Sequence, residues 1–154
     1  MVTGKEKTIS LNKTQLSTLL RISDPFLMID KVTNIVPSLS GCGFKHINKD
    51  EWFYKCHFTD EAIMPGTLQI EAMLQTIVAI IYSDTQLTNK NCLVTKSSAN
   101  FYLKISTSGD LTINAQITKN DRGIVQAKAD IYFDNKKTSD GIFKFINPDQ
   151  LKIK

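Results

Sequence analysis

Three features close together in the chain could carry out proton chemistry as a unit. His57 is followed by the tripeptide Met64-Pro65-Gly66 and then by Glu71, which lies inside a run of Leu, Ile, Ala and Met residues. Imidazole and carboxyl groups are common general bases and acids in enzymes. Each also has an ordinary structural interpretation, because a histidine can simply pack in the fold and a glutamate can reach an exposed edge or pair with a lysine. His46 is assigned only such a structural role.

The tripeptide Met64-Pro65-Gly66 is typical of the start of a helix. Proline fits the first turn because its missing N–H would have no partner there, and Gly66 lets another group approach the backbone closely. The first N–H groups of a helix lack partners inside it and lie at the positive end of its dipole. They could therefore stabilise an oxyanion that develops during a reaction, although the same tripeptide can be a plain helix start.

A long helix is predicted from Thr67 to about Ser83. Its apolar residues leave almost no polar face: Leu68, Ile70, Ala72, Met73, Leu74, Ile77, Val78, Ala79, Ile80 and Ile81. A helix that is apolar all round is a buried one. Glu71 would then lie where burial of a charge is costly without a partner.

Strands are predicted on both sides of this helix. After a mobile start over residues 1–10, we expect a short helix capped by Ser10. The expected strands cover 25–36, 43–58 with a turn at 48–51, 92–105, 111–118, 124–133 and 141–146. Short turns favour an antiparallel sheet, and one helix packed on such a sheet gives an α+β fold.

The whole chain, 1–154, is expected to form a single domain. A curved sheet wrapped around one helix is the natural way to bury a helix without a polar side. The remaining helix faces would need a second subunit, so we expect a dimer.

The composition excludes several classes of protein. The chain has 154 residues, 42% of them hydrophobic, and a formal net charge of +4, which is too weak to indicate nucleic-acid binding. The three cysteines, Cys42, Cys56 and Cys92, suggest neither a disulfide framework nor, with two histidines, a zinc site. They fit a reducing, cytoplasmic location, as does the absence of a signal-like apolar start. Cys56 and His57 would point to opposite faces of a strand, so a thiol mechanism is not expected.

Three segments together resemble the 3-hydroxyacyl-acyl-carrier-protein dehydratases, the hot-dog enzymes of fatty-acid synthesis. The central one is "CHF…MPGTLQIEAMLQ", whose His-to-Gly and His-to-Glu spacings are similar to those of the family. "LLRISDPFLMIDKV" and "SANFYLKISTSGDLTINAQI" resemble family segments on either side, so the resemblance covers roughly Leu19 to Phe145. "Cys-His-Phe" resembles the dehydratase–isomerase branch, whereas a glutamate as the acid resembles the general dehydratase branch.

The resemblance implies a hot-dog fold, a curved antiparallel sheet wrapped around one long central helix. It implies reversible dehydration of (3R)-3-hydroxyacyl thioesters on acyl carrier protein to trans-2-enoyl thioesters, without a metal or organic cofactor. His57 would be the base and Glu71 the acid or water-positioning group. The Gly66 amide would bind the thioester carbonyl, and the carbonyl of Ile63 would orient His57. His57 and Glu71 of one site would come from different subunits of a homodimer or a higher assembly.

The chain also differs from the family pattern. Thr59 and Ala62 stand at positions that are usually apolar or proline in the family, and Tyr102-Leu103 replaces a basic pair, with Lys104 and Lys96 nearby. Two alternatives share the fold. One is a hot-dog thioesterase that uses a helix carboxylate and water, and the other is a non-catalytic subunit that binds an acyl carrier.

Overall fold

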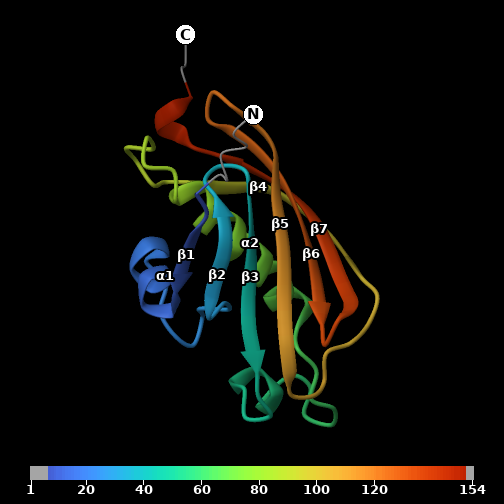
Figure 1. Ribbon diagram of the computed structural model, residues 1–154. Helices are drawn as coiled ribbons and strands as arrows, with labels where there is room; N and C mark the ends of the chain where they lie inside the picture. Colours follow the sequence, from blue (N-terminus) through green and yellow to red (C-terminus); the bar gives the residue numbers. More distant parts are fainter. Residues whose placement is uncertain (1–6, 152–154) are drawn as a thin grey trace, which may run out of the picture.

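One long helix, α2 (Gly66–Tyr82), lies inside the curve of a seven-stranded antiparallel sheet (Figure 1). The structure is a computed structural model, and it describes residues 7–151. The sheet order is β1-β2-β3-β5-β6-β7-β4. This is the expected α+β architecture, and the predicted helix 67–83 is confirmed to within one residue at each end.

The other elements follow the predicted order except for β1, a strand before the first helix that was not predicted. The strands are β1 (Ile9–Asn12), β2 (Lys31–Val36), β3 (Ser40–Ile47), β4 (Leu93–Phe101), β5 (Gly109–Asp121), β6 (Ile124–Phe133) and β7 (Lys136–Ile146). Besides α2 there is a short helix α1 (Lys13–Leu20), and there are single 3-10 turns at Trp52–Lys55 and Pro148–Gln150.

Helix α2 packs very closely on the concave face of the sheet. A Cβ atom at Gly43 of β3 would lie 2.3 Å from Oγ1 of Thr76, so only glycine allows the helix to approach this strand. Ile77 and Ile80 of α2 are fully buried in the same core as Phe143 of β7. The close packing fixes the helix, and with it every side chain that the helix presents to a site.

The sequence predicts a helix that is buried on every side, but one side of α2 is only partly covered in this protomer. Ile70, Glu71, Leu74 and Val78 are only half-buried, while most other residues of α2 are buried. Glu71, Leu74 and Val78 follow one another at spacings of three and four residues, so they share one face of the helix. This face is open towards the side of the protomer where α1 and the start of β4 lie.

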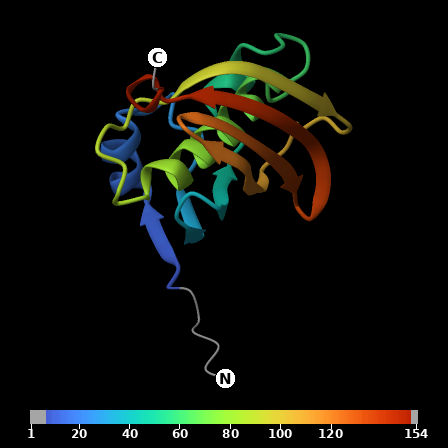
Figure 2. The same cartoon turned by 90° about the horizontal axis from the view of Figure 1, so that it is seen from above.

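Strand β4 forms one edge of the sheet (Figure 2). It pairs with β7 alone among the described strands, and its residues are exposed or half-buried. Large apolar side chains are exposed on the strand and just after it: Leu93, Val94, Phe101, Tyr102 and Leu103. The edge therefore combines open backbone groups with apolar surface.

Several predictions at the N-terminal side need correction. Ile9 and Ser10 lie in β1 and are not part of a mobile start. Lys7 and Thr8 have no regular secondary structure, and the rest of that prediction falls on residues 1–6, outside the described residues. The first helix begins at Lys13 and is capped by Asn12 instead of Ser10. Asn12 and Gln15 form a reciprocal capping box, which satisfies two backbone donors at once.

Three predicted strands are shorter than the sequence suggests, and two are longer. The strand expected over 92–105 covers only Leu93–Phe101. Those expected over 111–118 and 141–146 extend over Gly109–Asp121 and Lys136–Ile146. The strand expected over 25–36 begins only at Lys31, and the segment 25–30 is irregular although Leu27 and Ile29 are buried. The strand expected over 43–58 ends at Ile47, and Trp52–Lys55 forms a 3-10 turn.

Candidate active site

His57 is held by its backbone and by one ring nitrogen. Its N–H donates to the carbonyl of Phe53, and its Nδ1 lies 2.9 Å from the carbonyl oxygen of Ile63. A carbonyl oxygen can only accept, so Nδ1 carries the proton of the neutral ring. Nε2 is then the unprotonated nitrogen, which is the form that a general base requires.

The loop that follows His57 is closed by its own hydrogen bonds. The N–H of Ile63 donates to the carbonyl of His57 over 2.8 Å, and the N–H of Phe58 donates to the carbonyl of Glu61. The side chain of Glu61 forms an ion pair with Lys104, which joins the loop to the segment after β4. The turn Thr59-Asp60-Glu61 therefore holds the loop without a glycine.

Gly66 begins α2 beside this loop. Among the described residues no partner is found for the N–H groups of Gly66 and Thr67, and the next two N–H groups bind the carbonyl of Pro65. The ring of Phe101 covers Gly66, because a Cβ atom there would lie 2.9 Å from Cζ of Phe101. The two open donors thus lie at the positive end of a 17-residue helix.

A cavity of about 370 Å³ adjoins this helix start. It is lined by Ile63, Met64, Gly66, Gln69, Phe101, Tyr102, Leu103 and Lys104. The side chain of Gln69 is fixed because Oγ of Ser139 on β7 donates to its Oε1 over 2.8 Å. The sequence analysis missed this buried pair, and no local pattern could have joined positions 70 residues apart.

Glu71 is held from one turn further along α2. Nε2 of Gln75 donates to Oε1 of Glu71 over 2.9 Å. Gln75 is itself fixed, because it also donates to the carbonyl of Phe26 and accepts from the N–H of Met28. The spacing of four residues between Glu71 and Gln75 is the sequence signal for this contact.

Glu71 faces a second hollow, a groove of about 270 Å³ along the half-buried face of α2. Its lining is Leu20, Arg21, Ile22, Glu71, Leu74, Gln75, Val78, Tyr82, Asn91, Cys92, Leu93 and Val94. Burial raises the pKa of the Cys92 thiol in this lining to about 11. Apart from Glu71 and Arg21, the groove offers no charged side chain.

Within one protomer the ring of His57 binds the carbonyl of Ile63, and Ile63 and Gly66 line the same cavity, whereas Glu71 lines the groove along α2. No hydrogen bond or ion pair joins His57 to Glu71 within residues 7–151. Gly66 and Glu71 are five residues apart, which turns the chain by about 140° around the helix axis beyond one full turn. Glu71 therefore projects from a different side of the helix than Gly66 does.

The neighbouring cysteine plays no part in this arrangement. Sγ of Cys56 points towards the carbonyls of Trp52 and Phe53, at 3.5 and 3.7 Å. The residue before His57 belongs to the end of a 3-10 turn and not to a strand, so the expected alternation of faces does not apply. The conclusion that Cys56 and His57 do not cooperate still agrees with the observed contacts.

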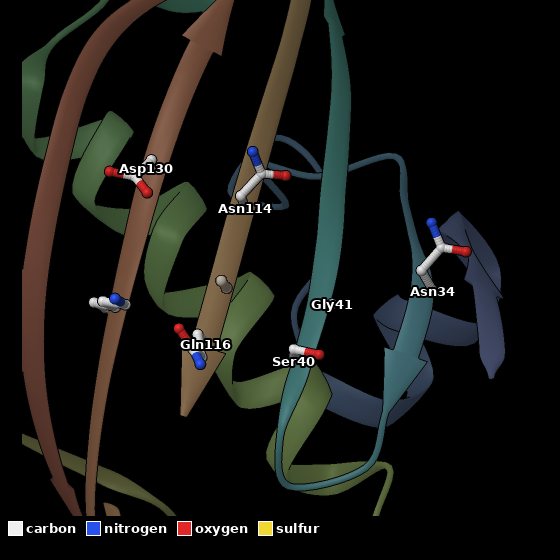
Figure 3. Close-up of a pocket in the computed structure, with 8 residues that line it drawn as sticks. Asn34, Ser40, Gly41, Asn114, Gln116 and Asp130 are labelled. Atoms are coloured by element: carbon white, nitrogen blue, oxygen red, sulfur yellow. The ribbon is translucent and has the colours of Figure 1, made fainter. Parts of the chain in front are cut away.

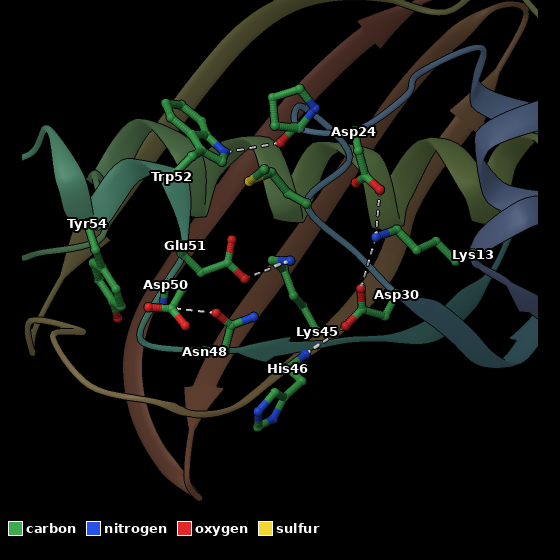
Figure 4. A network of polar contacts seen from close by, with 12 residues as sticks. Lys13, Asp24, Asp30, Lys45, His46, Asn48, Asp50, Glu51, Trp52 and Tyr54 are labelled. Carbon is green, nitrogen blue, oxygen red and sulfur yellow. Dashed lines mark hydrogen bonds and ion pairs between the residues drawn. The ribbon is translucent and has the colours of Figure 1, made fainter.

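A polar network secures the turn before His57 (Figure 4). Nζ of Lys45 lies 3.3 Å from Oε1 of Glu51, and both side chains are largely buried. Nε1 of Trp52 donates to the carbonyl of Pro25. These contacts fix the start of the short stretch that leads into His57.

Two other polar features lie outside the candidate site. His46 pairs with Asp110 at 2.8 Å on the surface, in agreement with a structural role. A shallow hollow lies on the convex face of the sheet, on the side away from α2 (Figure 3). It is lined by Asn34, Ser40, Gly41, Asn114, Ala115, Gln116, Lys128 and Asp130. Neither feature contacts His57, Gly66 or Glu71.

Comparison with known proteins adds a family to this geometry. The family model of the FabA-like domain matches residues 22–141. A 3-hydroxyacyl-[acyl-carrier-protein] dehydratase FabZ of Clostridium botulinum (strain Okra / Type B1) is 32% identical over 96 residues, which are 62% of this chain and 67% of the relative. The FabZ of Clostridium novyi (strain NT) is 45% identical over 51 residues, which are 33% of this chain and 36% of the relative.

Solved structures share the fold at low identity. The dehydratase heterocomplex ApeI:P from Xenorhabdus doucetiae matches with a TM-score of 0.69 and 14% identity, over 86% of this chain and 90% of that one. A hypothetical thioesterase with coenzyme A from Streptococcus pneumoniae TIGR4 matches with a TM-score of 0.58 and 13% identity, over 72% of this chain and 80% of that one. The fold is thus the predicted hot-dog fold.

No helix among residues 7–151 has the length and hydropathy needed to cross a membrane. The family model covers most of the chain, including the His57 loop, the start of α2 and Glu71. The chain therefore belongs to the FabA-like family, together with the 3-hydroxyacyl-[acyl-carrier-protein] dehydratases that it resembles.

Proposed function

We propose that this protein reversibly dehydrates (3R)-3-hydroxyacyl thioesters of acyl carrier protein to trans-2-enoyl thioesters during fatty-acid or related acyl-chain synthesis. The observation that carries the proposal is the state of His57. Its Nδ1 is occupied by the carbonyl of Ile63, and the open N–H donors of Gly66 and Thr67 begin the helix that follows its loop. Membership of a dehydratase family supports the same reaction.

The first half of the reaction needs a base and an oxyanion site together. Nε2 of His57 takes the proton from C2 of the acyl chain, which is a weak acid. The negative charge that develops on the thioester oxygen is stabilised by the Gly66 N–H and the positive end of α2. Because these donors are part of the backbone, they need no rearrangement during the reaction.

The second half of the reaction expels the hydroxyl group of C3. The electron pair of the broken C2–H bond forms the C2=C3 double bond while the C3–O bond breaks. Hydroxide is a poor leaving group, so it must receive a proton and leave as water. His57, Glu71 or a water held between them delivers this proton, and the balance of atoms and electrons requires no cofactor.

A complete site of this kind needs two protomers. Glu71 binds Gln75 and lines a different hollow from Gly66, so we infer that each Glu71 serves the His57 of a partner chain in a homodimer. The open edge of β4 and its apolar flank, from Leu93 to Leu103, support such an assembly. A symmetric dimer would hold two equivalent composite sites.

The partner that delivers the substrate would approach the cavity at the start of α2. Lys104 lines that cavity and Lys96 lies on exposed β4, so both could contact an acidic carrier protein. Tyr102 and Leu103 add exposed apolar surface between Gly66 and Lys104. The free thiols of Cys42, Cys56 and Cys92 fit a reducing cytosol as the compartment.

A thioesterase is the second candidate. Glu71 alone could position a water, and one structural neighbour is named as a hypothetical thioesterase. The oriented ring of His57 favours the dehydratase, since hydrolysis by a helix carboxylate needs no such base. A non-catalytic subunit is less compatible with both groups being held in place.

The deciding experiment supplies 3-hydroxyacyl and trans-2-enoyl thioesters of acyl carrier protein to the purified protein. Absorbance of the conjugated enoyl thioester is followed together with the release of free thiol. Interconversion without thiol release supports the dehydratase. Thiol release without interconversion indicates the thioesterase. The absence of both signals indicates a binding subunit.

A further inference from the structure

The groove beside Glu71 continues along the helix to Tyr82, the last residue of α2 that lines it. Glu71, Leu74, Val78 and Tyr82 all line it, at spacings of three or four residues on one face of α2. The facing wall carries the apolar side chains of Ile22, Leu93 and Val94, beside the polar Arg21 and Asn91. A carboxylate at one end and mostly apolar walls beyond it match the two chemical parts of a 3-hydroxyacyl chain.

Tyr82 lies at the far end of this groove and is held there by its hydroxyl. The residue is only 5% exposed, and its Oη accepts a hydrogen bond from the N–H of Cys92 over 2.8 Å. Nη2 of Arg21 donates to the carbonyl of Lys90 over 3.0 Å, which fastens the same loop to the end of α1. The end of the groove is therefore braced from two elements besides α2.

The distance from Glu71 to Tyr82 sets a length. The two residues are eleven positions apart, which is about 16 Å along the axis of an α-helix. Contact with the tyrosine ring takes up about 3.5 Å of that distance. An extended hydrocarbon chain advances by roughly 1.25 Å per carbon for C–C bonds of about 1.5 Å. The groove thus holds about ten carbons beyond the one that faces Glu71.

We propose that Tyr82 is the residue that limits acyl chain length. When Glu71 faces the hydroxyl-bearing C3, about ten further carbons fit beside the helix, so the longest even-numbered chain has about twelve carbons. This inference rests on the proposed function for the identity of the occupant. Tyr82 is a specificity-determining residue and takes no part in the chemistry. Val78, seven residues after Glu71, marks the middle of the same wall.

The test measures turnover over a homologous series of even-numbered acyl thioesters that brackets the expected limit on both sides. The unmodified enzyme should lose at least about tenfold in rate past the limit, since an apolar pocket discriminates by that factor for a misfit of a methylene or more. Tyr82→Ala should extend the limit by about four carbons, from the length of the removed ring. Val78→Phe should shorten it, and Tyr82→Phe should leave it unchanged.

A matched control guards against a general effect of losing a tyrosine. Tyr132→Ala makes the same substitution on β6, outside the groove lining, and should leave the length profile unchanged. If Tyr82→Ala does not fold, Val78→Phe alone decides, because it adds volume to a half-buried position. A length limit that neither variant moves would overturn the inference.

A second measurement separates this inference from the proposed function. Saturated acyl thioesters of N-acetylcysteamine cannot be dehydrated, but they can occupy the groove and raise the melting temperature. A rise that stops at the same chain length, and that shifts in the two variants, supports the groove even if no thioester is turned over. Turnover with a length profile that ignores Tyr82 and Val78 would keep the dehydratase and reject the groove.

Discussion

Nε2 of Gln75 donates a hydrogen bond over 2.9 Å to Oε1 of Glu71, and the side chain that makes this bond is only 2% exposed. Gln75 also binds the backbone of Phe26 and Met28, so its position does not depend on Glu71. The carboxylate therefore has one oxygen held by a fixed donor, and the other is free to meet a substrate or a water. Gln75 is a positioning residue in the proposed mechanism.

Replacement of Gln75 by leucine should lower both stability and turnover. The buried N–H of Met28 would lose its acceptor, which costs about 1–3 kcal/mol. A freer Glu71 should lower kcat more than it raises KM, and it should alter the pH profile of kcat. Denaturant unfolding and pH-dependent kinetics on one preparation check both effects. Lower stability with an unchanged kcat and pH profile would leave Gln75 with a purely structural role.

Replacement of His57 by alanine should abolish turnover and leave the fold intact. Loss of a general base typically costs about a hundredfold to ten-thousandfold in rate. Steady-state kinetics and a melting curve check the prediction. His46→Ala serves as the control, because His46 only pairs with Asp110 on the surface. Near-normal rates in His57→Ala would contradict the dehydratase assignment.

Glu71→Gln should separate catalysis from folding. The amide keeps the volume, and its oxygen can still accept from Gln75, so the melting temperature should stay equal or rise as a half-buried charge is removed. The rate should fall by orders of magnitude, because the amide cannot transfer a proton. Melting and rate are measured on the same preparation. A lower melting temperature with an unchanged rate would remove Glu71 from the site.

Composite sites predict recovery of activity in a mixture of two inactive variants. Random exchange of His57→Ala and Glu71→Gln chains gives about half heterodimers, each with one site that keeps both residues. Activity should thus return to roughly a quarter of that of the unmodified enzyme, by the same binomial count of intact sites. Subunit exchange is verified first by mass spectrometry with differently tagged chains. No recovery after verified exchange would contradict sites that are shared between subunits.

The thiol of Cys92 should react slowly at neutral pH. Burial disfavours the thiolate and raises its pKa to about 11. Below that value the thiolate fraction, and with it the alkylation rate, should increase about tenfold for each pH unit. A Cys42→Ser, Cys56→Ser variant isolates the thiol for labelling with iodoacetamide. At neutral pH, about four units below that pKa, labelling should be slow. Fast labelling there would show that the thiol is exposed and that the end of the groove is open.

The long helix and the last four strands could be predicted because their signals are local. The apolar run of α2 and the turn residues between β5, β6 and β7 point to one interpretation each. The prediction of a strand over 25–30 failed because the partner of its backbone is far away in the sequence. Its apolar residues are buried as in a strand, but the backbone of Met28 finds its partner in the side chain of Gln75. No local pattern reports that a glutamine 47 positions away replaces a strand neighbour.

The turn before His57 shows a second kind of limit. Trp52, Phe53 and Tyr54 have high strand propensity, yet they stack edge to face in a 3-10 turn, with ring centroids 5.7 and 4.9 Å apart. The motif in the sequence still located the contact between His57 and the carbonyl of Ile63 and the start of α2 at Gly66. It could not reveal that Gln75 holds Glu71 while it binds Phe26 and Met28, because those partners are far away in the sequence.

The open edge of β4 also matters before any assembly has formed. A newly synthesised chain carries an unpaired strand that can template the addition of a wrong strand, the first step of fibre growth. The middle of the strand, Thr95-Lys96-Ser97-Ser98, is polar and includes one positive charge. Lys96 thus acts as a gatekeeper that makes stacking of many copies costly while still allowing a single pairing. Its replacement by valine should turn an assembly edge into a nucleus for aggregation.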